Sequence, residues 1–107
     1  MTDDAPCAVV ITAPDAEWLA DFTKQLVMDR LCSTAHNIAP IRSIYRWRGE
    51  VHDTQEARAV LHTRASLVQR IVERTNAEHP YEVPGVSALP IIDGSPAYLE
   101  WILSETA

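Results

Sequence analysis

The hydrophobic pattern changes its period along this chain, and that change constrains the fold more than any other feature. Residues 8–12 (AVVIT) form a β-branched run closed by Ala13 and Pro14, which predicts a short, central, buried strand followed by a turn. From Asp15 onward the apolar residues recur at a spacing of three to four. This spacing predicts an amphipathic helix with an apolar stripe of Trp18, Leu19, Phe22, Leu26 and Val27.

Both ends of this helix carry suitable capping groups. Asp15 alone, or Thr12 together with Asp15, can accept hydrogen bonds from the free amides of the first turn. Arg30 is expected to favour the negative end of the helix dipole.

A long hairpin is predicted next. Residues 32–45 give few helix signals, and from Ile41 onward they alternate as a strand does, with Pro40 expected at a bend or a sheet edge. Residues 47–50 (WRGE) predict a turn in which glycine takes a positive φ. Residues 51–63 then predict the returning strand.

The second half of the chain again alternates helix and strand. Ser66 is expected to cap a helix that ends near Glu78, because the residue before Pro80 is pushed out of the helical region. Residues 86–92 predict a strand, and Pro96 is placed to open a short final helix.

The order strand, helix, strand, strand, helix, strand predicts the fold class. It is typical of an α/β (α+β) domain of the ferredoxin-like split βαβ type, here with a long central hairpin and a short C-terminal helix. A chain of 107 residues with 47% hydrophobic content suits one domain over residues 1–107.

Composition excludes several classes of partner. The net charge of −6 repels phosphate backbones, so we expect no nucleic acid partner. Arg42, Arg46 and Arg48 cluster locally, but their alternation with aromatic residues is typical of a solvated strand face. No stretch approaches the roughly 20 apolar residues of a spanning helix, so we expect no membrane insertion.

The cysteines and the N-terminus predict the compartment. The first residues lack the basic and apolar regions of a signal peptide, so a cytoplasmic location is expected. Cys7 and Cys32 are therefore expected to be free thiols rather than a disulfide.

Two features predict an oligomer. The hairpin is long for so small a domain, and its edge offers unpaired amides to another chain. The aromatic residues Tyr45, Trp47, Tyr98 and Trp101 lie outside the helix stripes, and such residues are favoured at subunit contacts.

Four segments, in order, resemble the signatures of the CutA divalent-ion-tolerance family. They are residues 43–50 (SIYRWRGE), 78–84 (EHPYEVP), 88–91 (ALPI) and 94–101 (GSPAYLEW). The resemblance implies a ferredoxin-like fold and a tight homotrimer whose hairpins pair between subunits, similar in architecture to the PII signalling proteins. It also implies a non-enzymatic role in tolerance of divalent cations such as copper.

The chain departs from the family pattern at two positions. Thr34 stands where members commonly carry a cysteine, and His62 stands where they carry a lysine before Thr63. These changes put in doubt a metal-ligand role for that cysteine and an anion contact for that lysine.

His79, Tyr81 and Glu82 form the densest group of functional side chains. An imidazole and a carboxylate suit a divalent transition metal, so His79 and Glu82 are candidate ligands for Cu(II) or another divalent cation. Alternatively, the charge of His79 complements the dipole at the end of the second helix and Tyr81 packs at an interface. No pair among the other histidines and cysteines has the spacing of a local metal motif.

A second hypothesis needs no metal. In a PII-like sensor or scaffold, an intersubunit cleft lined by Trp47, His62, Tyr81 and Glu82 would bind a small metabolite or a partner protein. An enzyme that uses His79 and Glu82 as acid and base is the weakest hypothesis, because no nucleophile motif or glycine-rich phosphate loop is present. We therefore predict no enzymatic activity.

Overall fold

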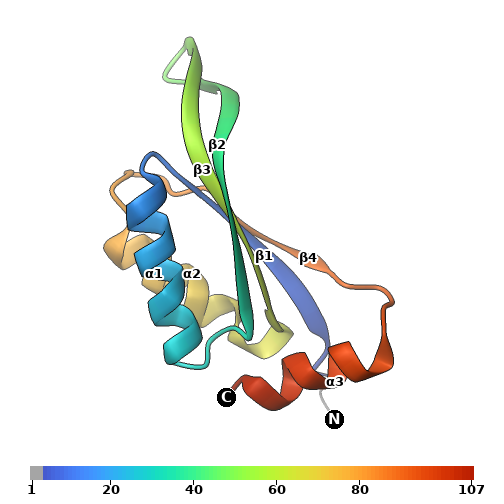
Figure 1. Cartoon of the computed structure of the whole chain (residues 1–107). Helices are drawn as coiled ribbons and strands as arrows, with labels where there is room; N and C mark the ends of the chain where they lie inside the picture. The colour runs from blue at the N-terminus through green and yellow to red at the C-terminus, as the bar shows by residue number, and fades with distance from the viewer. Residues whose placement is uncertain (1–3) are drawn as a thin grey trace.

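The structure, a computed structural model, describes residues 4–107. These residues form one antiparallel sheet of four strands with helices packed on it. In chain order the elements are β1 (Pro6–Ala13), α1 (Ala16–Met28), β2 (Thr34–Trp47), β3 (Glu50–Arg64), a 3-10 turn (Ala65–Leu67), α2 (Val68–Glu78), β4 (Val86–Pro90) and α3 (Pro96–Glu105). The strands lie in the order β2-β3-β1-β4, with β1 in the interior as predicted (Figure 1). The ferredoxin-like arrangement is confirmed.

Helices α1 and α2 cover one face of the sheet (Figure 1). Alternate residues of β1 point into this layer and are buried, because successive strand side chains lie on opposite faces. Each fully buried Leu or Ile contributes about 1.5–3 kcal/mol. The two cysteines are also buried and are free thiols, as predicted. The buried apolar side chains of this layer include Val9, Ile11, Leu19, Phe22, Leu26, Leu31, Leu61, Leu67 and Ile71.

The β2–β3 hairpin projects beyond the body of the domain (Figure 1). β1 pairs with β3 only over residues 57–64, so residues 50–56 of β3 pair with β2 alone. At the tip, Arg48 and Gly49 both have positive φ, 51° and 80°, the combination that a two-residue hairpin turn requires. The register shifts between Ile38 and Ile41 on edge strand β2, which confirms the prediction that Pro40 marks a bend or an edge.

Three local predictions were wrong. β2 begins at Thr34 rather than at Ile41, because residues 34–38 pair with 58–62 of β3 although their sequence alternates poorly. Ser66 does not cap α2; it lies in the 3-10 turn, and its amide and hydroxyl both donate to the carboxylate of Asp4. Arg30 does not serve α1, because its guanidinium donates to the carbonyls of Ser104 and Glu105 at the end of α3.

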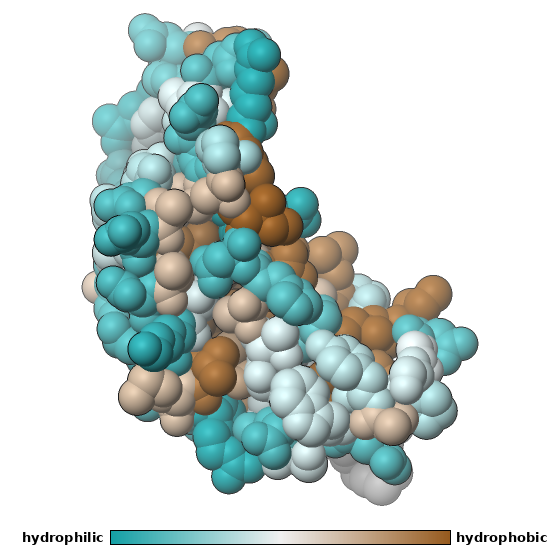
Figure 2. All heavy atoms as spheres, viewed as in Figure 1, coloured by the Kyte–Doolittle hydropathy of each residue, from teal (hydrophilic) through white to brown (hydrophobic). Residues whose placement is uncertain are grey.

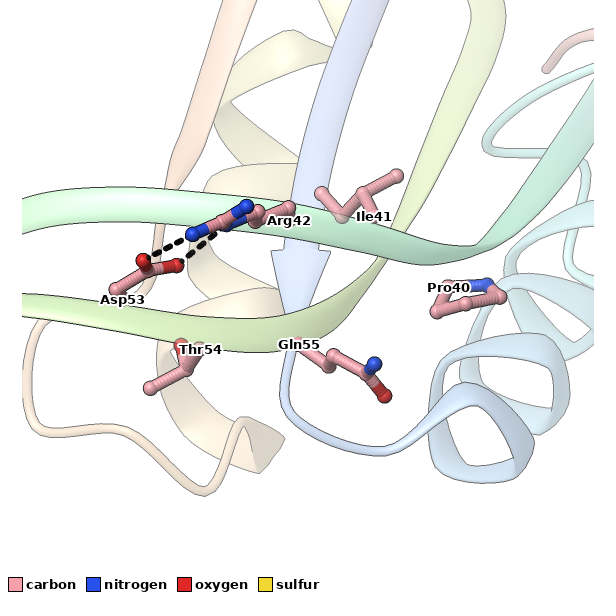
Figure 3. Close-up of a pocket in the computed structure, with 6 residues that line it drawn as sticks. All are labelled: Pro40, Ile41, Arg42, Asp53, Thr54 and Gln55. Atoms are coloured by element: carbon pink, nitrogen blue, oxygen red, sulfur yellow. Dashed lines mark hydrogen bonds and ion pairs between the residues drawn. The ribbon is translucent and has the colours of Figure 1, made fainter.

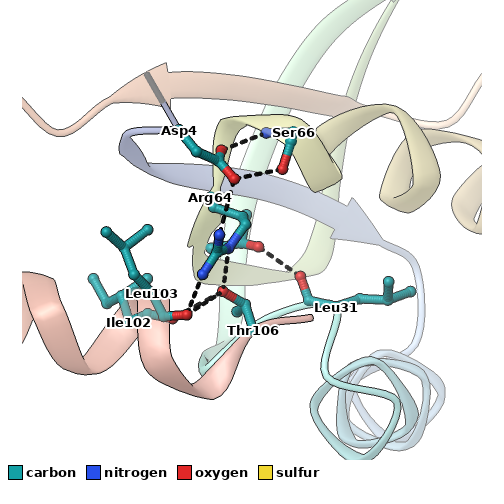
Figure 4. Close-up of polar contacts among 8 residues, drawn as sticks. Asp4, Leu31, Arg64, Ser66, Ile102, Leu103 and Thr106 are labelled. Atoms are coloured by element: carbon teal, nitrogen blue, oxygen red, sulfur yellow. Dashed lines mark hydrogen bonds and ion pairs between the residues drawn. The ribbon is translucent and has the colours of Figure 1, made fainter. Parts of the chain in front are cut away.

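A polar network fastens α3 to the end of the sheet (Figure 4). Arg64 donates to Thr106 Oγ1 at 2.9 Å, to Asp4 Oδ2 at 3.0 Å and to the carbonyl of Leu103. Cations suit this position, because the last carbonyls of a helix carry partial negative charge. Arg64 therefore joins the N-terminal segment, β3 and α3.

The remaining face of the sheet and its two edges carry uncovered apolar side chains. Figure 2 shows hydrophobic atoms running from the base of the hairpin toward the end of β4. Within residues 4–107, no helix has the length and apolar character that crossing a bilayer requires. The exposed apolar residues on β2, β3, β4 and the loops beside them include Ile38, Ile44, Val51, Val83, Leu89 and Ile92.

Candidate functional site

A groove of about 680 Å³ lies between the hairpin and the loop that follows α2. The loop consists of residues 79–85. Both of its ends bond to Thr12 of β1, and Tyr81 and Glu82 bond to the hairpin. Aromatic and apolar side chains line it together with three charged ones, and a mostly apolar lining with a few polar groups is typical of small-molecule sites. The groove is lined by Thr12, Ser43, Ile44, Tyr45, Trp47, Arg48, Glu56, Pro80, Tyr81, Glu82, Val83 and Gly85.

Tyr81 forms the wall of the groove and ties the loop to β3. Its hydroxyl donates to Glu56 Oε2 at 2.8 Å, and Glu56 is only 8% exposed. Burial, reinforced by the carboxylate of Glu56, raises the pKa of Tyr81 well above its usual range. Tyr81 therefore stays protonated and acts as a hydrogen-bond donor.

Arg48 closes the groove at the tip of the hairpin. Its guanidinium lies 5.2 Å from the ring centroid of Trp47 and 2.5 Å from Glu82 Oε2. This ion pair is largely exposed, so it contributes little to stability. The positive φ of Arg48 is the one that the two-residue turn requires, so the turn fixes where the arginine lies relative to the groove.

His79 anchors the start of the loop. Its Nε2 donates to the carbonyl of Thr12 at 2.7 Å, and its Nδ1 accepts from the amide of Tyr81 at 3.0 Å. Accepting at Nδ1 requires a neutral ring, so a charge on His79 does not act on the dipole of α2 in this arrangement.

The candidate metal ligands His79 and Glu82 do not converge. Both ring nitrogens of His79 are engaged, and the carboxylate of Glu82 pairs with Arg48. Among residues 4–107 no three side chains of His, Cys, Asp or Glu come together as a metal cluster. These two residues therefore do not fit a metal ion as they stand, and binding there would require the loop to rearrange.

Three of the four predicted cleft residues line one groove, and the fourth does not. Trp47, Tyr81 and Glu82 line it together. His62 lies elsewhere on β3, where its Nδ1 is 2.6 Å from the hydroxyl of Tyr98 and its ring is 5.6 Å from that of His36. Burial and the neighbouring His36 lower the pKa of His62.

Sequence reasoning missed Arg48 and Glu56 as groove residues. Arg48 was grouped with its neighbours as a solvated strand face, and that interpretation holds for Arg42. Figure 3 shows Arg42 paired with Asp53 across the hairpin, at 2.6 and 2.8 Å, beside a smaller hollow near the strand irregularity. The turn predicted over residues 47–50 was the available signal, because it places Arg48 at the tip of the hairpin rather than on the strand face.

Comparison with known proteins gives consistent matches over nearly the whole chain. The family model described as CutA1 divalent ion tolerance protein matches residues 7–105. The divalent-cation tolerance protein CutA of Thermus thermophilus is 39% identical over 98 residues, which cover 92% of this chain and 95% of that protein. Chloroplastic CutA of Arabidopsis thaliana is 37% identical, but the match covers 54% of its length, so the chain spans about half of that relative.

Solved structures agree with these matches. The divalent cation tolerance protein from Thermus thermophilus superposes with a TM-score of 0.91 at 37% identity, covering 95% of this chain and 99% of the other. CutA1 from Oryza sativa superposes with a TM-score of 0.92 at 32% identity, covering 96% and 94%. The names of the two Thermus thermophilus proteins describe tolerance of divalent cations.

Proposed function

Because the chain belongs to the CutA1 divalent ion tolerance protein family, we propose that it is a non-enzymatic homotrimer that acts in tolerance of divalent cations such as Cu(II) by binding them directly. The observation that carries the assembly is the pair of open sheet edges. Strands β2 and β4 each have one unpaired side, and apolar side chains lie exposed next to both. Open edges of this kind pair with other chains unless they are covered.

The two edges differ, which favours a ring over a symmetric dimer. Contact between the β2 side of one copy and the β4 side of the next is head-to-tail, and such contacts form a ring when the rotation from one copy to the next closes. The hairpin needs this support, because an isolated two-stranded hairpin is only marginally stable in water. The number three comes from the family resemblance.

The cation part of the proposal is supported by the relatives' names and by charge. A net charge of −6 attracts cations to the surface over a long range. The site at His79 and Glu82 stays a prediction, since both side chains are otherwise engaged in the structure. Free thiols at Cys7 and Cys32 suit a reducing compartment, so a cytoplasmic location is part of the proposal.

Native mass spectrometry of the purified protein with added Cu(II) tests assembly and metal binding together. We expect a three-chain species that retains Cu(II) and does not retain Mg(II), since nitrogen ligands favour the transition metal. A three-chain species with no retained Cu(II) at micromolar metal would remove direct binding and leave the assembly intact.

The composition of the groove favours a second candidate, a PII-like sensor or scaffold. The groove places Trp47 and Tyr81 beside the guanidinium of Arg48, which suits a planar or anionic metabolite. A thermal-shift screen with nucleotides and organic anions tests it, because a ligand specific to the folded state raises the melting temperature. Trp47→Ala is the variant in which that shift should disappear.

A further inference from the structure

His36 and His62 lie side by side on adjacent strands, away from the groove. In the β2–β3 register Thr34 is opposite His62 and His36 is opposite Val60, so the two histidines are diagonal neighbours. The neighbours of His62 on β3, Leu61 and Thr63, are buried beneath the helices. Successive strand side chains lie on opposite faces, so His62 points away from α1 and α2. The rings of the two histidines are 5.6 Å apart, centroid to centroid, at an angle of 90°.

This separation suits two ligands of one metal ion. With metal–nitrogen bonds of about 2.0–2.1 Å, the centroids of two imidazoles on one ion lie roughly 4.5 Å apart at the 90° angle that Cu(II) prefers and roughly 5 Å apart at a tetrahedral angle. In the single chain His36 is exposed, and its ring makes no hydrogen bond to any other residue from 4 to 107. Its ring is therefore free to rotate toward an ion held by His62.

Tyr98 of α3 orients the second ring. Its hydroxyl oxygen lies 2.6 Å from His62 Nδ1. When Nδ1–H donates to this oxygen, the Nε2 lone pair of His62 is free for a metal. Metal-binding histidines usually donate their other ring N–H to such a partner, which fixes the tautomer and the ring orientation.

We propose that His36 and His62 form a two-histidine site for a divalent transition-metal ion, with Cu(II) as its best fit and Tyr98 as the positioning residue. This proposal rests on the proposed function and names where the cation is bound. Two imidazoles select Cu(II), Ni(II) or Zn(II) over Mg(II) and Ca(II), which prefer oxygen ligands. Water fills the remaining coordination positions.

The other two histidines do not offer a comparable pair. His79 uses both ring nitrogens within the fold. His52 stacks on Tyr45 in the projecting hairpin, with ring centroids 5.2 Å apart. His52 therefore provides a matched control, since His52→Gln removes one histidine and leaves the pair intact.

Calorimetric titration of Cu(II) into the intact protein tests the proposal. We expect one ion per chain for the wild type, at least tenfold weaker binding for His36→Gln and for His62→Gln, and a change within twofold for His52→Gln. Tyr98→Phe is expected to weaken binding about tenfold, the effect usual for a residue that orients a ligand. Equal binding by all four variants and the wild type would overturn the site while leaving direct binding by the protein intact.

A second measurement does not depend on how the variants fold. In the wild type, substoichiometric Cu(II) should broaden the imidazole NMR signals of His36 and His62 and spare those of His52 and His79. Selective broadening of His79 would place the cation in the groove loop and overturn the proposal. If no histidine signal broadens and no heat is released, direct Cu(II) binding itself fails.

Discussion

Replacing Tyr81 with phenylalanine tests how the groove is held together. The change removes one hydroxyl, which donates at 2.8 Å to the carboxylate of Glu56. A hydrogen bond to a charged group contributes about 1.5–3 kcal/mol. Because Glu56 is buried, its carboxylate cannot recover the lost donor fully from water. Because Tyr81 itself is partly exposed, we expect the lower part of that range, and Tyr81→Phe should reduce the free energy of unfolding by about 1.5–2 kcal/mol.

Urea unfolding at fixed protein concentration measures this loss. With a denaturant slope of about 1–3 kcal/mol/M, the midpoint should fall by roughly 1 M. Glu56→Gln should cost less, because the amide oxygen still accepts the hydrogen bond. The double variant should show a coupling energy of about 1 kcal/mol between the two positions. The exposed Glu73→Gln controls for loss of a carboxylate and should change stability by less than about 0.5 kcal/mol.

The reasoning fails if Tyr81→Phe costs less than about 0.5 kcal/mol, or if the two changes are additive. Either result would mean that the hydroxyl exchanges its bond with water at no cost. The loop would then be held by the bonds of His79 and Gly85 to Thr12 and by the ion pair of Glu82 with Arg48.

Two further predictions concern backbone packing and pH. A Cβ on Gly85 would lie 2.8 Å from Thr12 Oγ1, so Gly85→Ala should lower the free energy of unfolding in urea by about 1–3 kcal/mol. A Cβ on Gly94 would have its nearest contact at 3.4 Å, so Gly94→Ala should lower it by less than about 1 kcal/mol. Equal losses for the two variants would contradict the steric argument. Hydrogen bonds from Ser66, with a smaller contribution from Arg64, lower the pKa of Asp4. The stabilisation that follows from this lowered pKa is complete above the unfolded pKa of about 3.9 and is lost as the pH falls through the folded pKa. Asp4→Asn should therefore lower the free energy of unfolding by about 1 kcal/mol at pH 7 and by progressively less as the pH falls below 4, and a loss that stays the same between pH 7 and pH 2 would refute this assignment.

Much of the fold could be predicted because it follows from local periodicity. The β-branched run of β1 and the apolar stripe of α1 identify a strand and a helix without any knowledge of what they contact. The start of β2 was missed because residues 34–38 take strand structure from pairing with β3 rather than from their own alternation. Pairing of this kind depends on tertiary context, which a single sequence does not display.

The caps and the site depended on distant partners. Asp15 caps α1 as the local rules predicted. Asp4 lies 62 positions from Ser66, and Arg30 lies 74 positions from Ser104, so the same rules selected the wrong partners for Ser66 and Arg30. Three of the groove residues, Trp47, Tyr81 and Glu82, were predicted from the sequence. The bonds that decide what each side chain can do join residues far apart, as with His62 and Tyr98.

The central claim is that the projecting hairpin and the open edges of β2 and β4 are completed by other copies of the chain. Sedimentation equilibrium at micromolar concentration measures this directly. The account predicts a single folded species with three times the 11.9 kDa mass of the chain. A folded species that sediments at 11.9 kDa and keeps a cooperative unfolding transition would contradict it, because the hairpin would then be stable without a partner.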